Sequence, residues 1–206
     1  MKRIFILLFL SFCFVSSTLW AATGPTQQVE KIVDSVLKVL NRTDIDYATK
    51  RQKVSGLVQS HINIDSISQR TLATHWKKAT PQQRERFSML FVQVLEMTYL
   101  NRIEDYSGGR VDYLSERVKG DKAIVDTQFV SEKLEIPVQY KMVQKQGIWE
   151  IYDVVIENVS LVRNYRSSYG EIVNSEGFEG LFAKLEGKLA EQSAAEKKQS
   201  AAEKKQ

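Results

Sequence analysis

The spacing of apolar residues changes once along this chain, at the Ser-Gly-Gly segment 107–109. Before this segment, apolar side chains recur every three or four residues, which places them on one face of a helix. After it, they alternate with polar residues, as in a strand with one buried face. Helices, then neighbouring strands, then helices again predict an α+β domain whose helices gather over one face of a curved sheet.

The first half of the chain carries several helix signals. An apolar stripe from Val29 to Leu40 predicts a helix that begins near Thr26. A second helix is expected after Asp44, and a third from Ile64 to Trp76 with Asp65 as its N-cap.

The segment Thr80-Pro81-Gln82-Gln83 is a specific helix start. It combines a capping residue, proline at the first helical position and glutamine three residues after the cap. The helix that follows has a wide apolar stripe from Phe87 to Ile103, and it is expected to stop at the Ser-Gly-Gly segment.

Short connections separate the strands of the second half, so neighbouring strands are expected to be antiparallel. On the third strand, alternate residues from Ile136 to Met142 form an apolar face opposite a more polar one, the pattern of a sheet covered on one side. One helix capped by Ser160 should then run to about Asn174, and another from Phe178 to Leu189. The four expected strands are Val111 to Arg117, Lys122 to Val130, Leu134 to Lys145 and Ile148 to Glu157.

The two ends of the chain lie outside the expected domain, which spans residues 23–190. Residues 1–22 have the pattern of a cleaved signal peptide: two basic residues, an apolar run too short to span a bilayer, and small residues before the cleavage site. An uncleaved anchor is the alternative. Residues 191–206 contain a perfect repeat of Ala, Glu, Lys, Gln and Ser without an apolar stripe, and are expected to be disordered.

Few residues in the chain are suited to catalysis or metal binding. Its lone cysteine, Cys13, lies in the signal peptide, and two histidines remain, so no zinc cluster or Cys-His nucleophile is expected. No catalytic residue, metal or cofactor is therefore predicted. The balance of 29 basic against 25 acidic residues does not suggest nucleic acid. One catalytic arrangement stays open: an inward carboxylate among Asp126, Asp153 and Glu157 beside a tyrosine, as in cone-shaped isomerases.

Three segments resemble the MlaC family of periplasmic phospholipid carriers, the toluene-tolerance auxiliary proteins of Gram-negative ABC transport systems. The segments are Trp149 to Tyr169, His75 to Thr80 and Phe87 to Tyr106. The resemblance covers the chain from about Thr26 to about Leu189. It implies an NTF2-like cone, in which a four-stranded antiparallel sheet and the helices over one of its faces enclose a hydrophobic pocket.

The resemblance also implies a function. The protein would shuttle intact phospholipids through the periplasm to maintain outer-membrane lipid asymmetry. Its partners would be an outer-membrane lipoprotein associated with porin and an inner-membrane ABC transporter with a ring-forming lipid-binding subunit. A periplasmic chaperone for lipoprotein or polypeptide, which would need an open groove, and an isomerase-like enzyme on the same fold are the alternatives.

Candidate site residues follow from the direction in which side chains face. The sequence alone does not distinguish a filled core from one with room for acyl chains, and it is the resemblance that favours a phospholipid site. Three arginines, Arg102, Arg163 and Arg166, together with Lys141, are candidates to fringe the head group. The candidates for contact with acyl chains are Leu95, Tyr99, Ile103, Ile136, Val138, Tyr140, Met142, Val155, Leu161, Val162 and Tyr165.

Overall fold

The structure is a computed structural model that describes residues 23–101 and 103–203. The predicted signal peptide, residues 1–22, and the head-group candidate Arg102 lie outside these residues. The first helices and the 3-10 turn η1 are α1 (Pro25–Leu40), α2 (Tyr47–His61), α3 (Ile64–Leu72), α4 (Thr74–Lys78), α5 (Pro81–Leu100) and η1 (Ile103–Tyr106). The strands and the final helix are β1 (Arg110–Lys119), β2 (Lys122–Val130), β3 (Glu135–Lys145), β4 (Ile148–Ile156), β5 (Val159–Ser160) and α6 (Leu161–Glu203).

The helix starts follow local chemistry. At the start of α5 the Thr80 hydroxyl accepts from the backbone N–H of Gln83, whose side chain accepts from the Thr80 N–H, so the expected capping box is confirmed. The cap of α3 is Asn63 rather than the predicted Asp65. Asn63 has extended backbone and its Oδ1 accepts from the Ser66 N–H at 2.9 Å, whereas Asp65 already lies in the first turn.

The third predicted helix is interrupted. Ala73 has a φ of 50°, which ends α3 and begins the short α4 in place of one helix from Ile64 to Trp76. A left-handed alanine is uncommon, and no Gly or Pro marks this position, so the sequence carries no signal for the break.

The sheet is antiparallel with the order β1-β2-β3-β4-β5. The four predicted strands are confirmed to within two or three residues at their ends. A fifth strand was not expected. Glu157 and Asn158 both have positive φ, and this tight turn brings β5 back to pair with Val155 and Ile156 before α6 begins.

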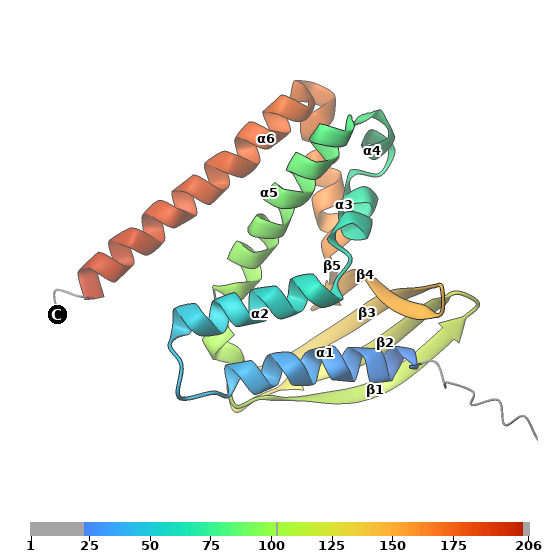
Figure 1. The fold of residues 1–206 in the computed structure, drawn as a ribbon, viewed down its shortest axis with the longest axis vertical. Coiled ribbons are helices and arrows are strands. Elements are labelled where there is room, and N and C mark those ends of the chain that lie inside the picture. Colours follow the sequence, from blue (N-terminus) through green and yellow to red (C-terminus); the bar gives the residue numbers. More distant parts are fainter. Residues whose placement is uncertain (1–22, 102, 204–206) are drawn as a thin grey trace, which may run out of the picture.

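The helices form two groups around the sheet (Figure 1). Helix α1 lies across one face of the sheet, and α2 runs beside it. Helices α3 and α5 and the first part of α6 extend away from the sheet, where α6 contacts both of the others. This arrangement confirms an α+β fold, with five strands where the sequence predicts four.

Two large hydrophobic cores result from this arrangement, beside a smaller cluster of Leu40, Val54 and Ile103. The helical core lies between α3, α5 and α6, where the ring centroids of Phe91 and Tyr165 are 5.2 Å apart and Leu181 and Phe182 are fully buried. The sheet core lies under α1, where Val29 and Ile32 pack on β2, β3 and β4. Each core buries enough apolar side chains to hold its helices in place.

Helix α6 bends back at Gly177, whose φ of 71° interrupts the helical backbone. Glycine adopts this conformation without the steric cost that other residues incur. The segment after Gly177 packs on α5 through Leu181 and Phe182, so the break predicted between Asn174 and Phe178 is confirmed. Backbone helix continues to Glu203, into the repeat for which the sequence predicts disorder, because Ala, Glu and Lys readily extend a helix that is already nucleated.

Candidate functional site: an apolar cavity between the sheet and the helices

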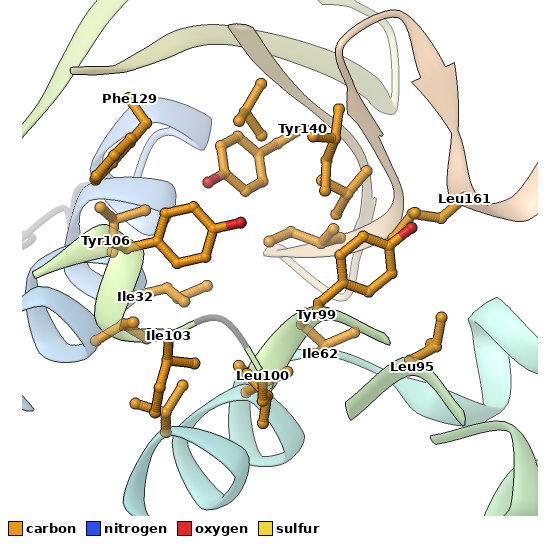
Figure 2. Close-up of a pocket in the computed structure, with 18 of the residues that line it drawn as sticks. Ile32, Ile62, Leu95, Tyr99, Leu100, Ile103, Tyr106, Phe129, Tyr140 and Leu161 are labelled. Atoms are coloured by element: carbon orange, nitrogen blue, oxygen red, sulfur yellow. The ribbon is translucent and has the colours of Figure 1, made fainter. Parts of the chain in front are cut away.

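A cavity of about 330 Å³ lies between the sheet and α1, α2 and α5. Its wall is formed by apolar side chains from those helices, from α3 and η1, from β1 to β4, and from the first residue of α6. Figure 2 shows these side chains directed into a common space. The cavity borders the helical core and shares Ile67 with it, but the other buried residues of that core are not in the cavity wall.

Most of the residues predicted to contact acyl chains are in this wall. They come from three different parts of the chain that the fold brings together: the end of α5 with η1, the strand β3, and the start of α6. Their contact with a lipid stays a prediction. The predicted residues that line the cavity are Leu95, Tyr99, Ile103, Ile136, Val138, Tyr140 and Leu161.

The other four candidates lie outside the wall. Met142 is fully buried in the sheet core, beyond a bulge between Lys141 and Met142 that shifts the register with β4. Val162 and Tyr165 face the helical core. Val155 was assigned to the wrong face of β4: its neighbours Val154 and Ile156 line the cavity, and side chains alternate along a strand.

Helices α1 and α2 supply wall residues that the sequence analysis did not select. Val36 and Leu37 from α1 and Val54 and Val58 from α2 line the cavity. Their spacing predicts only that they face inward. An inward-facing residue has the same periodicity whether it meets another side chain or open space, so no signal in the sequence could have identified them.

One charged residue, Glu96 of α5, also belongs to the wall. Its Oε1 accepts a hydrogen bond from the Ser55 hydroxyl at 2.5 Å and from the Gln59 side-chain amide at 2.6 Å, and both donors belong to α2. These bonds join two helices that otherwise make few contacts, because Val54 is the only residue of α2 that is fully buried. The wall between α2 and α5 is therefore held mainly by polar contacts.

Three tyrosines place their rings around the cavity (Figure 2): Tyr99 from α5, Tyr106 from η1 and Tyr140 from β3. Burial, followed by the nearby Tyr165 phenol, raises the pKa of Tyr99 to about 12. Burial likewise raises the pKa of Tyr140 to about 12. All of these shifts keep the phenols neutral, so they are hydrogen-bond donors at physiological pH.

The start of α6 is fixed by a buried carboxylate. Asp153 of β4 accepts hydrogen bonds from the Val162 N–H at 3.1 Å and the Ser160 hydroxyl at 2.7 Å, and it pairs with Lys141 at 3.1 Å. Ser160 caps the helix as predicted, since its Oγ accepts from the Arg163 N–H at 3.1 Å. These bonds place Leu161 in the cavity wall.

The head-group candidates differ in their surroundings. Arg166 donates to the backbone oxygen of Arg70, and Lys141 is engaged by Asp153, so both already have protein partners. Arg163 is exposed, and among the described residues its side chain has no hydrogen bond or ion pair. It lies in the first turn of α6, as Leu161 does, and it is the described head-group candidate without a protein partner.

The carboxylates considered for isomerase chemistry do not face the cavity. Asp126 lies on the other face of the sheet, where it accepts from Ser115 and Gln139, and Glu157 is exposed in the turn before β5. Asp153 is occupied at the start of α6. Within the described parts of the chain, no cluster of three or more His, Cys, Asp or Glu is placed to hold a metal ion. Over the same residues, no helix has the length and apolar character required to cross a bilayer.

Fold and site together define an α+β protein built around an apolar internal cavity. The chain belongs to the MlaC protein family, which matches residues 30–187. It is 23% identical over 182 residues to the intermembrane phospholipid transport system binding protein MlaC of Haemophilus influenzae, covering 84% of this chain and 85% of that protein. It is 24% identical over 119 residues to the toluene tolerance protein Ttg2D of Pseudomonas putida, covering 56% of this chain and 55% of the relative.

A solved structure has the same fold. The phospholipid-binding protein of Ralstonia solanacearum, determined in complex with a phospholipid, superposes with a TM-score of 0.74 at 21% sequence identity. The match covers 81% of this chain and 97% of that one. The likeness therefore extends over nearly the whole of the solved domain.

Proposed function

We propose that this protein binds an intact phospholipid in the cavity and carries it through the periplasm between outer-membrane and inner-membrane machinery. The cavity itself is the observation that carries this proposal: apolar side chains from both layers of the fold enclose space that protein atoms do not fill. Family membership supports a phospholipid as the ligand, and so do the phospholipid transport protein of Haemophilus influenzae and the phospholipid-binding protein of Ralstonia solanacearum to which the chain is similar.

The energetics of acyl chains favour such a carrier. Each buried methylene contributes about 0.8 kcal/mol, so two chains of about fifteen methylenes each represent on the order of 24 kcal/mol relative to water. Escape of the lipid through water is then negligible. Release requires a second apolar environment, which a membrane or another lipid-binding protein supplies. A carrier of this kind delivers its cargo on contact with its partner.

The cavity must enlarge to take both tails. Its volume of about 330 Å³ is at the lower end of the roughly 300 to 1,000 Å³ that ligand pockets span. We place the enlargement at α2. This helix buries only Val54 fully, and it is joined to α5 by polar bonds: Ser55 and Gln59 donate to Glu96, and the Tyr47 hydroxyl donates to backbone oxygens at the end of α5. Outward movement of α2 would widen the cavity without disturbing the helical core.

The head group would stay outside, because burying a phosphate has a large desolvation cost. Leu161 lines the cavity, and Arg163 is exposed in the same first turn of α6, with no competing partner among the described residues. Its side chain leaves the helix on nearly the opposite side from Leu161, so it would contact the phosphate only by reaching around the start of α6. The proposal places the glycerol between the phosphate outside and the tails inside the cavity.

The route and the wider fold class complete the proposal. The partners would be an outer-membrane lipoprotein–porin complex and an inner-membrane ABC transporter with a ring-forming lipid-binding subunit, and the traffic would maintain outer-membrane lipid asymmetry. The curved sheet with helices over one face corresponds to an NTF2-like cone. The described carboxylates considered for catalysis already have partners or are exposed away from the cavity, which supports a carrier rather than an enzyme.

Solvent extraction of the gently purified protein followed by mass spectrometry tests the proposal. We expect about one or more intact phospholipids per protein molecule. A variant with a bulkier side chain in the wall, Val138→Trp, should fold and carry much less lipid, because Val138 faces the cavity. Recovery of no phospholipid from several preparations of the natural protein, or of hydrolysed lipid alone, would contradict the proposed carrier.

A further inference from the structure

The polar groups of the cavity wall suggest a finer specificity than affinity for hydrocarbon. The wall is mostly apolar, yet besides Glu96 and Thr127 it includes the phenols of Tyr99, Tyr106 and Tyr140. A hydroxyl in such a wall has a desolvation cost unless it finds a hydrogen-bond partner. Pure hydrocarbon tails offer no partner, so these groups favour a ligand with acceptor oxygens near its tails.

Tyr99 is the strongest of the three candidates, because Tyr106 already has an interaction within the protein. In Figure 2 its ring is directed into the cavity and its hydroxyl points toward Leu161, which lines the same cavity. Among the described residues the Tyr99 hydroxyl has no hydrogen-bond partner. The environment of Tyr140 differs, because its hydroxyl is near Thr127, whose own hydroxyl donates to the Val138 carbonyl oxygen at 3.0 Å. The donor that awaits a ligand acceptor is therefore on Tyr99.

The position of Tyr99 indicates which acceptor it would meet. The proposed phosphate position is near Arg163, outside the cavity, and the tails lie inside. The atoms that join them must pass Leu161, and the Tyr99 hydroxyl is on that side of the cavity. In a diacyl phospholipid these atoms are the two ester linkages, whose carbonyl oxygens are hydrogen-bond acceptors.

We propose that Tyr99 donates a hydrogen bond to an ester carbonyl of the bound lipid and thereby makes the protein selective for acyl esters over alkyl ethers. The inference rests on the proposed phospholipid carrier and adds a specificity-determining residue to it. A neutral hydroxyl is suited to this role because its pKa, raised to about 12 by burial, keeps the proton on the phenol.

The decisive probe is a pair of lipids that differ only in the carbonyl group. The full-length protein is incubated with vesicles that contain equal amounts of dihexadecanoyl and dihexadecyl phosphatidylglycerol, so that it can exchange its lipid. The lipids bound to the re-isolated protein are then measured by mass spectrometry. We expect the diester to be enriched about three- to tenfold, the range that one neutral hydrogen bond gives. The Tyr99→Phe variant should bring the ratio close to one, because it removes the hydrogen bond that only the diester accepts.

The control variant is Tyr169→Phe, which removes a phenol hydroxyl from the helical core, outside the cavity. It should keep the enrichment of the natural protein. A ratio near one for the natural protein, or a ratio unchanged by Tyr99→Phe, would overturn the role of Tyr99 and leave the carrier proposal standing. Binding of neither lipid would overturn both.

Discussion

The helical core and the cavity are built from adjacent faces of the same helix, α5. Phe87, Phe91 and Val94 are completely buried against α3 and α6. Val92 and Tyr99 border the cavity on the side of the sheet and α2. One face thus meets close-packed rings and the other meets open space, although both are apolar. Apolar character alone therefore does not determine whether a surface is filled.

The helical core and the cavity differ in how the helix opposite α5 is held, which is α6 in the helical core and α2 at the cavity. In the helical core, α6 packs on α5 with four aromatic rings, Phe87, Phe91, Tyr165 and Tyr169, in mutual contact. At the cavity, α2 packs on α1 through a small apolar cluster around Val54, and polar bonds from Tyr47, Ser55 and Gln59 join it to α5. The helical core is therefore held by close-packed rings, whereas the α2 side of the cavity is held mainly by polar bonds. This difference would allow the cavity to widen around the proposed lipid while the helical core stays unchanged.

The largest expected contrast is in the response to truncation. Phe91→Ala should lower the free energy of unfolding by about 3–5 kcal/mol, because it leaves a hole in a filled core. Ile136→Ala, on the cavity wall, should cost only about 1 kcal/mol, since this side chain already borders open space. Urea denaturation measures both. Equal losses at the two sites would mean that the cavity is in practice as well packed as the helical core.

Lipid should stabilise the molecule through the cavity. At about 24 cal/mol per Å³, a volume of about 330 Å³ corresponds to about 8 kcal/mol, comparable with the 5–15 kcal/mol of a typical domain. Bound lipid at a hundred times its Kd adds about 2.7 kcal/mol by linkage. Thermal scans before and after delipidation should therefore differ by about 5–10 °C. An unchanged melting temperature would count against a ligand in the cavity. As a control, the delipidated protein is scanned with dodecyl maltoside at the concentration used for the lipid, which measures the effect of a detergent alone.

A matched pair of enlargements separates the two regions further. Val94→Phe should destabilise the protein by about 1–3 kcal/mol, because Val94 is fully buried in the helical core and the larger ring has no space. Val138→Phe should leave the stability unchanged or raise it, since its ring extends into the cavity. The second variant should also lose lipid. A large loss of stability with Val138→Phe would show that the space there cannot accept a ring.

Much of the fold could be predicted from the sequence because local rules determine it. The alternation of apolar residues gave four strands within a few residues of their ends, and the capping box at Thr80 marked the start of α5. The errors occur at single positions. Ala73 has a positive φ with no Gly or Pro beside it, and Asn158, which tolerates positive φ, is the one local signal for the turn at Glu157.

The cavity was less predictable, since its existence depends on how elements that are distant in the sequence fit together. Leu95 and Leu161 were selected correctly as inward-facing, but Val162 and Tyr165 have the same periodicity and pack in the helical core. On β4, which is apolar on both faces, Val155 was chosen in place of its neighbours because alternation alone does not say which face is inside. The number of atoms that fill a space is a property of the assembled layers.

The start of α6 lies between the helical core and the cavity, and a substitution there should cause the smallest loss of stability. Ser160 accepts from the Arg163 N–H and donates to Asp153, just before Leu161 of the cavity wall and Val162 of the helical core. Ser160→Ala removes the cap and should cost about 1 kcal/mol, whereas Ser160→Gly should cost only a few tenths. Hydrogen exchange should rise about fivefold at residues 161–164 in the alanine variant and stay unchanged in the middle of α5.

If residues 161–164 exchanged at the same rate in the alanine variant as in the natural protein, the Ser160 cap would contribute nothing to the stability of this part of the cavity wall. Faster exchange in α5 as well would mean that the two regions unfold as one unit. The expected local change instead follows from the bonding pattern, because the cap and Asp153 hold only the first turn of α6, while the aromatic rings hold the turns that follow. The wall of the cavity can then loosen at α6 while the helical core stays intact.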